Sequence, residues 1–406
     1  MTDERLKALA KQFGTPAFVF DQDAFAQRIH SVRAIFPQGV RLCYSIKANP
    51  FLITAAKAHV DALEVCSPGE LTICEQTQVS PAQIIFSGVN KTIDDIRRAA
   101  ADKVGVFTAE SALQLQKIDA VGRERGAVLP VLLRLESGSQ FGMDEAVLRS
   151  IVQNRAEYAG VCIKGIHFFT GTMRRKTQEL AGELAMLTEL MDALYREYGY
   201  RAEKLEFGPG LFTPYFTSED FSDTLAPAKA LAPLLESLAQ KVELTVEMGR
   251  FFAAECGYYL TKVEDVKCNR GTQYAIVDGG VNHVNYYGQT MGMKVPIIRH
   301  FPAEENAQTP CNKSEAQGKD GEVNDAWTLC GSLCTTADVL VRRAAFTGLC
   351  VGDTLAFCNI GAYSVTEGLA LFLSRSLPRV LLYSGEGTVQ ARDFVQTSSF
   401  NTIMKP

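Results

Sequence analysis

The chain has 406 residues, of which 47% are hydrophobic and 21% are charged, and its formal net charge is −5. This length allows two domains, or one large barrel with an appendage. Acidic and basic residues are interleaved, so we expect neither nucleic acid nor a membrane surface as a partner. No apolar run reaches the length of a membrane span, and the segment Met1–Gly14 is too charged for a signal peptide.

The eleven cysteines are scattered and include no Cys-x-x-Cys pair. Cys330 and Cys334 are the closest pair, and they lack the second pair or the histidine partner that a zinc site needs. We therefore predict no metal site. An odd number of mostly apolar-flanked cysteines is typical of a reducing compartment, which favours a cytoplasmic protein.

Strand-like and helical segments alternate through the first part of the chain. A strand at 17–20 is followed by an amphipathic helix over 22–36, which Asp21 is placed to cap. Further strand-like runs begin near Arg41, Ala62, Gln83, Val104, Val128, Cys162, Glu203 and Val242. Helical stretches between these runs cover residues 52–59, 69–78, 92–101, 110–126, 144–154, 176–198 and 221–240.

This alternation of strands and helices from Arg41 onward requires right-handed crossovers and a parallel sheet. Eight repeats over roughly 210 residues fit a closed (β/α)8 TIM barrel better than an open doubly wound sheet. The first βα turn also lacks the G-x-G-x-x-G motif of a dinucleotide-binding fold. We therefore predict an α/β protein built on a TIM barrel.

After Arg250 the sequence pattern becomes β-rich. Strands are predicted at 258–266, 272–277, 353–359 and 379–383, without long helices between them. We expect three parts, which are an N-terminal segment 1–25 that pairs with the β domain, a barrel at 26–257 and a C-terminal β domain at 258–406. The polar, turn-rich stretch 302–325 is expected to be a mobile surface loop.

Lys47 is the first candidate for chemistry. It follows the short strand that begins at Arg41, and Asn49–Pro50 turns the chain into a loop directly after it. A lysine at the carboxyl end of a buried strand can be held in dry surroundings, which lowers its pKa and exposes a nucleophilic amine. The alternative is a lysine whose charged end merely reaches solvent from the strand end.

Small, hydroxyl and cationic residues gather where the last three barrel strands end. They are Gly171, Thr172, Gly208, Gly210, Gly249 and Arg250. Glycines let backbone N–H groups approach an anion, a hydroxyl adds a donor and an arginine neutralises charge. Barrels often bind phosphate after strands seven and eight. For Gly208–Pro209–Gly210, a plain turn is the alternative.

Glu247 is a carboxylate at the end of an interior strand, where it must meet a cation or a ring N–H to stay ionised. An ion pair with Arg250 is one way to satisfy it. Pyridoxal phosphate is another, because its aldehyde suits Lys47, its phosphate suits the glycine loops and Arg250, and its pyridine nitrogen suits Glu247.

Five motifs then occur in order. Tyr44–Asn49 is similar to Y-x-x-K-A-N, Glu64–Leu71 to E-V-x-S-x-G-E-L, Glu247–Arg250 to E-P-G-R, Gly331–Asp338 to G-P-x-C-[DE]-x-x-D and Gly361–Tyr363 to G-A-Y. Over nearly its whole length the chain thus resembles the fold-type III pyridoxal-phosphate enzymes, specifically the diaminopimelate/ornithine decarboxylase group. The resemblance implies an alanine racemase-like barrel with a β-rich domain, and a homodimer with shared active sites.

The resemblance also implies roles for individual residues. Lys47 and Cys334 are the catalytic residues, and Cys334 reaches into the partner subunit's site to protonate the product carbon. The expected cofactor-binding residues are Lys47, Arg134, Phe169, Thr172, Gly208, Gly210, Glu247, Gly249, Arg250 and Tyr363. Thr335 and Asp338 are the expected substrate contacts.

This chain departs from the family pattern around the cofactor. Phe169 stands where the H-x-G-S motif has histidine, and Thr172 stands where it has serine. A phenyl ring can still stack on the pyridine face. His167 lies two residues earlier, on the same strand face as Phe169, and we expect it to be a satisfied core histidine rather than a cofactor contact. Pro209 removes one N–H from the phosphate loop.

Two further departures concern the substrate. Thr335 replaces the acid that meets the distal ammonium of diaminopimelate or ornithine, and 278–287 replaces the R-P-x-L-Y segment. Burying an unpaired distal zwitterion costs several kcal/mol, so we do not expect lysine as the product. Segments 140–144, 170–172 and 333–335 instead resemble the branch that acts on tethered substrates, such as glutamyl groups on an acyl carrier protein.

We therefore expect a pyridoxal-phosphate-dependent α-decarboxylase of an amino acid or aminoacyl group in a specialised biosynthetic pathway. A diaminopimelate decarboxylase, an amino-acid racemase on the same fold and a non-catalytic homologue that binds a partner are the alternatives. A metal-dependent barrel hydrolase has little support, because the five histidines show no ligand-like clustering.

Overall fold

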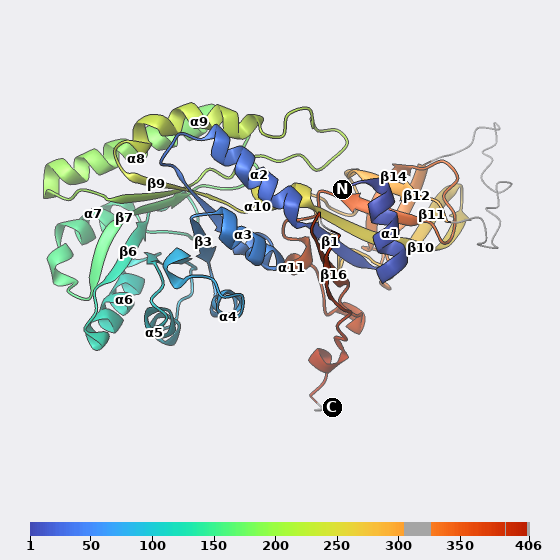
Figure 1. The fold of residues 1–406 in the computed structure, drawn as a ribbon, viewed down its shortest axis with the longest axis horizontal. Coiled ribbons are helices and arrows are strands. Elements are labelled where there is room, and N and C mark those ends of the chain that lie inside the picture. The colour runs from blue at the N-terminus through green and yellow to red at the C-terminus, as the bar shows by residue number, and fades with distance from the viewer. Residues whose placement is uncertain (304–325, 386, 404–406) are drawn as a thin grey trace. The chain divides into compact units, whose positions relative to one another are not determined.

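The computed structural model describes residues 1–303, 326–385 and 387–403, so most of the predicted surface loop 302–325 lies outside the described residues. The chain divides into two compact units (Figure 1). The barrel unit consists of Ala26–Thr213 and Asp223–Phe252. The β unit consists of Met1–Phe25, Pro214–Ser222 and Ala253–Pro406.

Eight parallel strands close the barrel, which confirms the predicted fold. They are β2 (Arg41–Ser45), β3 (Ala62–Val65), β4 (Ile84–Phe86), β5 (Val106–Ala109), β6 (Leu129–Arg134), β7 (Val161–Phe169), β8 (Lys204–Gly208) and β9 (Glu243–Met248). The last strand, β9, pairs with the first, β2, and places Cys43 opposite Glu247. This seam joins parts of the site that lie far apart in the sequence.

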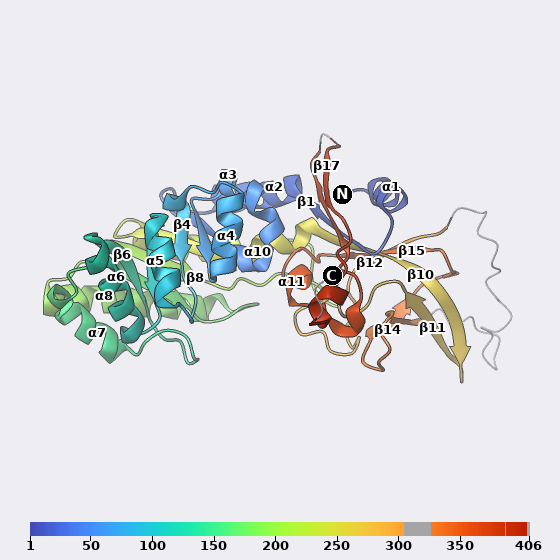
Figure 2. The ribbon, with the colours of Figure 1, turned by 90° about the horizontal axis from the view of Figure 1, so that it is seen from below.

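Helices cover the outside of the barrel (Figures 1 and 2). They are α3 (Ile53–His59), α4 (Pro68–Gln76), α5 (Ile93–Ala101), α6 (Ala112–Arg125), α7 (Glu145–Gln153), α8 (Thr177–Tyr198) and α9 (Ala226–Ala239), and α2 (Gln22–Ile35) precedes β2. Ion pairs Arg98–Glu75 and Arg97–Glu124 link α5 to α4 and to α6.

Local sequence signals fix where some of these helices begin. The Ser67 hydroxyl accepts a hydrogen bond from the backbone N–H of Glu70 at the start of α4. Thr92 and Asp95 form a reciprocal capping box at the start of α5. Caps of this kind satisfy backbone donors that have no partner within the helix.

The β unit contains a mixed sheet that the structure describes with nine strands. They are β1 (Ala17–Asp21), β10 (Gly257–Asn269), β11 (Thr272–Val277), β12 (Ile298–Phe301), β13 (Ala326–Cys330), β14 (Val339–Ala345), β15 (Thr354–Cys358), β16 (Arg379–Tyr383) and β17 (Val389–Arg392). The N-terminal strand β1 lies between β10 and β16. Helix α1 (Asp3–Phe13), which the sequence reading missed, packs Leu6 and Leu9 into the core of this sheet.

No helix in the described parts of the chain is both long enough and apolar enough to cross a membrane.

Candidate active site

Lys47 lies in a short 3-10 turn, Ile46–Ala48, at the carboxyl end of β2. The Tyr44 hydroxyl donates to the Asn49 carbonyl at 3.0 Å, and the Asn49 side chain accepts from the Phe51 N–H at 3.1 Å. Tyr44 and Asn49 are fully buried. The sequence Tyr-x-x-Lys-x-Asn therefore builds the turn that presents the lysine.

Carboxylates surround the Lys47 amine. Its Nζ lies 2.6 Å from Glu64 Oε2, 3.6 Å from Glu247 Oε1 and 3.6 Å from Cys66 Sγ. The lysine side chain is 40% exposed, whereas those of Glu64 and Glu247 are only 2% and 3% exposed. The expectation of a lysine held by dry surroundings was thus incomplete, because ion pairs to buried carboxylates hold an amine that a ligand can reach.

Glu247 is held by three side chains, two from the carboxyl end of β2 and one from β7. The Ser45 hydroxyl donates to its Oε1, His167 Nε2 lies 3.2 Å from its Oε2, and Lys47 faces Oε1. Burial raises the pKa of Glu247, but the charge of Lys47 and the hydrogen bond of His167 outweigh that effect and hold the pKa well below its ordinary value. Glu247 therefore presents a stable negative charge inside the barrel.

His167 is only 1% exposed and lies on β7. Its Nε2 contacts Glu247, and its Nδ1 has no hydrogen-bond partner among the described residues. The histidine is buried as expected, but its Nε2 contacts the Glu247 carboxylate, which we propose as a cofactor ligand. The period of two along β7, which places His167 and Phe169 on one face, was the signal for this contact.

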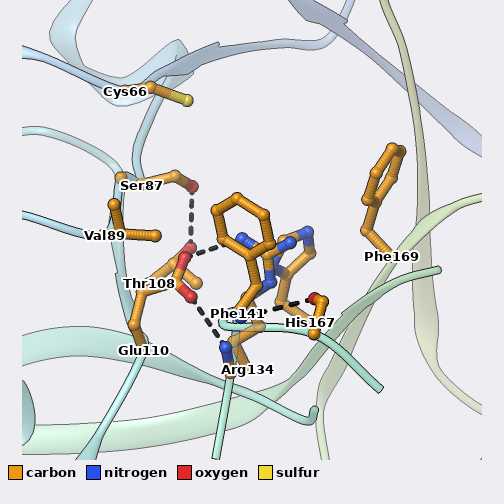
Figure 3. Close-up of polar contacts among 12 residues, drawn as sticks. Cys66, Ser87, Val89, Thr108, Glu110, Arg134, Phe141, His167 and Phe169 are labelled. Atoms are coloured by element: carbon orange, nitrogen blue, oxygen red, sulfur yellow. Dashed lines mark hydrogen bonds and ion pairs between the residues drawn. The ribbon is translucent and has the colours of Figure 1, made fainter. Parts of the chain in front are cut away.

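Arg134 makes an ion pair with Glu110 at 2.7 Å, and both side chains are buried (Figure 3). The second Glu110 oxygen accepts from the Gly142 N–H at 2.9 Å, and the Arg134 guanidinium lies 4.8 Å from the centre of the Phe141 ring. Arg134 and Glu110 therefore hold the loop after β6. A direct contact of Arg134 with a cofactor stays a proposal.

The loops after β7, β8 and β9 approach one another closely. A Cβ atom on Gly208 would lie 2.3 Å from the Phe169 ring, and one on Gly210 would lie 1.7 Å from the Gly171 carbonyl oxygen. Arg250, at the start of α10 (Arg250–Ala253), donates through Nε to the Thr172 hydroxyl at 3.3 Å. Glycine backbone, a hydroxyl and a guanidinium are therefore assembled in the way that a phosphate requires.

The close approach at Gly210 predicts a specific cost for a side chain there. Gly210 has φ +56°, and Gly199, at the end of α8, has φ +61° with no atom within 4 Å of a built Cβ. Replacing Gly199 by alanine should cost roughly 1–2 kcal/mol of backbone strain alone. Replacing Gly210 by alanine should cost roughly 1–3 kcal/mol more, because of the clash. Urea unfolding of the two variants compares them, and equal losses would contradict the packing argument.

Cys334 and Thr335 are exposed in the β unit, on the loop between β13 and β14. Asp338, only 2% exposed, accepts from the backbone N–H groups of Val281 at 2.8 Å and Leu333 at 2.7 Å. These bonds occupy the Asp338 carboxylate in holding the loop that carries Cys334. A substrate would therefore have to share the Asp338 carboxylate with these two backbone N–H groups. Substrate contacts of Asp338 and Thr335 stay proposals.

Tyr363 precedes the short helix α11 (Ser364–Glu367) with φ +70° and ψ −37°. Its carbonyl accepts from the N–H groups of Thr366 at 2.8 Å and Glu367 at 2.9 Å. A bulky residue with positive φ is strained, and such residues gather at ligand sites. This conformation supports a binding role for Tyr363.

The residues of the barrel unit fit pyridoxal phosphate. Lys47 offers a reachable primary amine for its aldehyde, and the ionised Glu247 suits its protonated pyridine nitrogen. Thr172, Arg250 and the close-packed glycines suit its phosphate. A TIM barrel with this donor set and a separate β sheet defines the fold-type III class of pyridoxal-phosphate enzymes.

Comparison with known proteins agrees with this class. Residues 22–254 match the family model for "Pyridoxal-dependent decarboxylase, pyridoxal binding domain", so the chain belongs to this family. It is a pyridoxal-phosphate-dependent amino-acid decarboxylase, which is a carboxy-lyase.

The relatives act on different substrates. The chain is 26% identical over 400 residues to the L-glutamyl-[BtrI acyl-carrier protein] decarboxylase of Niallia circulans. This alignment covers 93% of this chain and 90% of that protein. It is 24% identical to the diaminopimelate decarboxylase of Aquifex aeolicus, with 88% and 84% covered. The solved structure of the M. jannaschii diaminopimelate decarboxylase with L-lysine shares the fold, with a TM-score of 0.82, 24% identity, and 98% and 94% covered.

Proposed function

We propose that this enzyme removes a free α-carboxylate from an amino acid or tethered amino acid without a distal zwitterion, such as a glutamyl group linked to an acyl carrier protein through its γ-carboxyl group. The observation that carries the proposal is the state of residues 278–287. Asp278 and His283 in this segment make contacts within the β unit, and the Thr335 side chain carries no charge.

Asp278 accepts hydrogen bonds from the hydroxyls of Thr15 and Thr261, each at 2.5 Å. His283 is 4% exposed, and its Nδ1 lies 2.8 Å from the Tyr259 hydroxyl. Burial lowers the pKa of His283 to about 4, so this histidine is neutral near neutral pH. The segment therefore supplies no cation for the distal carboxylate of diaminopimelate. The similarity to an L-glutamyl-[acyl-carrier protein] decarboxylase also supports a carrier-bound glutamyl substrate.

Pyridoxal phosphate, when bound, supplies an electron-accepting ring beside the α-carbon. Lys47 would hold its aldehyde, Glu247 would hold the proton on its ring nitrogen, and Thr172 and Arg250 would hold its phosphate. The Cys334 thiol protonates the α-carbon after CO2 has left. We also propose a homodimer with shared active sites, in which Cys334 serves the partner subunit.

A substrate screen with the holoenzyme tests the proposal. The panel contains free glutamate, ornithine, lysine and diaminopimelate, together with a γ-linked glutamyl thioester of an acyl carrier protein. Mass spectrometry should show loss of CO2 from the carrier-bound glutamyl group and none from diaminopimelate. Conversion of diaminopimelate to lysine would contradict the substrate assignment. Exchange of the α-proton with the carboxylate retained would indicate a racemase.

A further inference from the structure

Glu206 is a buried carboxyl group that the proposed reaction does not use. It lies on β8 and is only 1% exposed. One of its oxygens, one oxygen of Glu247 and one ring nitrogen of His167 all lie within 4.8 Å of one another. Neither Glu206 oxygen has an N–H or O–H partner among the described residues, and the Cys43 thiol is a polar group beside them.

The donors in this part of the barrel are distributed unevenly. Ser45 donates to Glu247, and His167 and Lys47 contact Glu247 as well. The Lys47 amine is also in contact with Glu64, at 2.6 Å. The groups that act on Glu206 from the neighbouring strands and strand ends are Cys43, Lys47, Glu64, His167 and Glu247.

Two buried carboxylates this close cannot both remain ionised without a large cost, because like charges within a few ångströms repel strongly in a low dielectric. Of the two carboxyl groups, Glu206 has fewer hydrogen-bond donors around it, so Glu206 is the one expected to be protonated. Burial, followed by repulsion from Glu247 and Glu64, raises the pKa of Glu206 well above its ordinary value. The contacts and the charge balance thus agree.

We propose that Glu206 is a positioning residue that stays protonated beside Glu247, so that the pair carries one negative charge and Glu247 holds it for the ring nitrogen of the cofactor. The inference rests on the cofactor of the family and does not depend on which substrate is decarboxylated. The Glu206 carboxyl group fills the barrel interior without adding a second negative charge.

Infrared spectroscopy of the holoenzyme tests the protonation directly. A buried, protonated carboxyl group has a C=O stretch apart from the carboxylate and amide bands, and the band shifts in D2O. We expect this band in the wild-type holoenzyme above neutral pH and its loss in Glu206→Gln. The control is Glu203→Gln, because Glu203 is exposed and paired with Lys164 at 2.8 Å. That variant should retain the band.

The cofactor spectrum provides a second readout. Glu206→Gln keeps a neutral polar side chain and should leave the pH profile of the cofactor absorbance unchanged. Glu206→Leu replaces the polar carboxyl group near Glu247 by an apolar side chain, which desolvates Glu247 further, and it should shift the apparent pKa of that profile by about 1 unit. If the glutamine variant does not fold, loss of the infrared band in Glu206→Leu decides the question.

Two results would overturn the proposal. One is the absence of the band above neutral pH, or its persistence in Glu206→Gln, because Glu206 would then be ionised or would not be the source. The other is a stoichiometric divalent cation in the holoenzyme that Glu206→Gln removes, because a cation bound by His167, Glu206 and Glu247 would keep both carboxylates ionised.

Discussion

Replacing Lys47 by alanine should abolish the visible absorbance of the lysine-bound cofactor and lower CO2 release by on the order of 10⁴-fold or more. The Lys47 amine is the group placed to bind the cofactor aldehyde, and its Nζ lies 2.6 Å from Glu64 and 3.6 Å from Glu247. Absorbance spectra and a CO2 assay on the purified variant measure both effects.

The matched control is Lys47→Arg. Arginine keeps a cation beside Glu64 and Glu247, so this variant should fold like the wild type. It has no primary amine to bind the aldehyde, so the absorbance should still be lost. If Lys47→Arg retained both the absorbance and CO2 release, Lys47 would act only through its charge.

Replacing Glu247 by glutamine should lower kcat by on the order of 10²–10³-fold, because the negative charge that keeps the cofactor ring nitrogen protonated is removed. Ser45 and His167 can still contact the amide, so the variant should fold. Steady-state kinetics and the pH dependence of the cofactor spectrum measure the effect. Glu243→Gln on the same strand is the control, because Glu243 is an exposed partner of Arg41 and Lys204.

The same substitution should change how stability depends on pH. The pKa of Glu247 is lowered in the folded protein, so its ionised form contributes stability above the pKa of the unfolded chain. That contribution is lost as the pH falls toward the folded-state pKa. Glu247→Gln should lack this acid-side loss. An unchanged difference between wild type and variant across the acid range would contradict the lowered pKa.

The sequence predicted the barrel because its repeat is local. The strands and helices from Arg41 to Met248 alternate in a locally readable pattern, and some of the helices have side-chain caps, such as Ser67 and Thr92. Helix α1 was not predicted. Its short apolar stripe is stabilised by tertiary packing, since Leu6 and Leu9 pack on the sheet of the β unit. Its pattern alone did not separate it from a charged tail.

The motifs pointed to Lys47, Glu247 and Arg250, but they could not show which neighbours act on them. Glu64 contacts Lys47 because β3 pairs with β2, and Glu247 faces Lys47 and Ser45 because the barrel closes between β9 and β2. His167 on β7 reaches Glu247 on β9 past the intervening strand β8. The pairs Arg134–Glu110 and Asp338–Leu333 likewise gave structural partners to residues that the family pattern had assigned to ligands.

The sequence by itself therefore predicted the fold and the cofactor class, which are confirmed, since these follow from periodicity and short motifs. It also indicated Lys47 as the lysine that we propose for the cofactor. Only the tertiary structure decided the charge distribution around that lysine. The protonation of Glu206 and Glu247 depends on distances between side chains on different strands, and no local sequence pattern contains those distances.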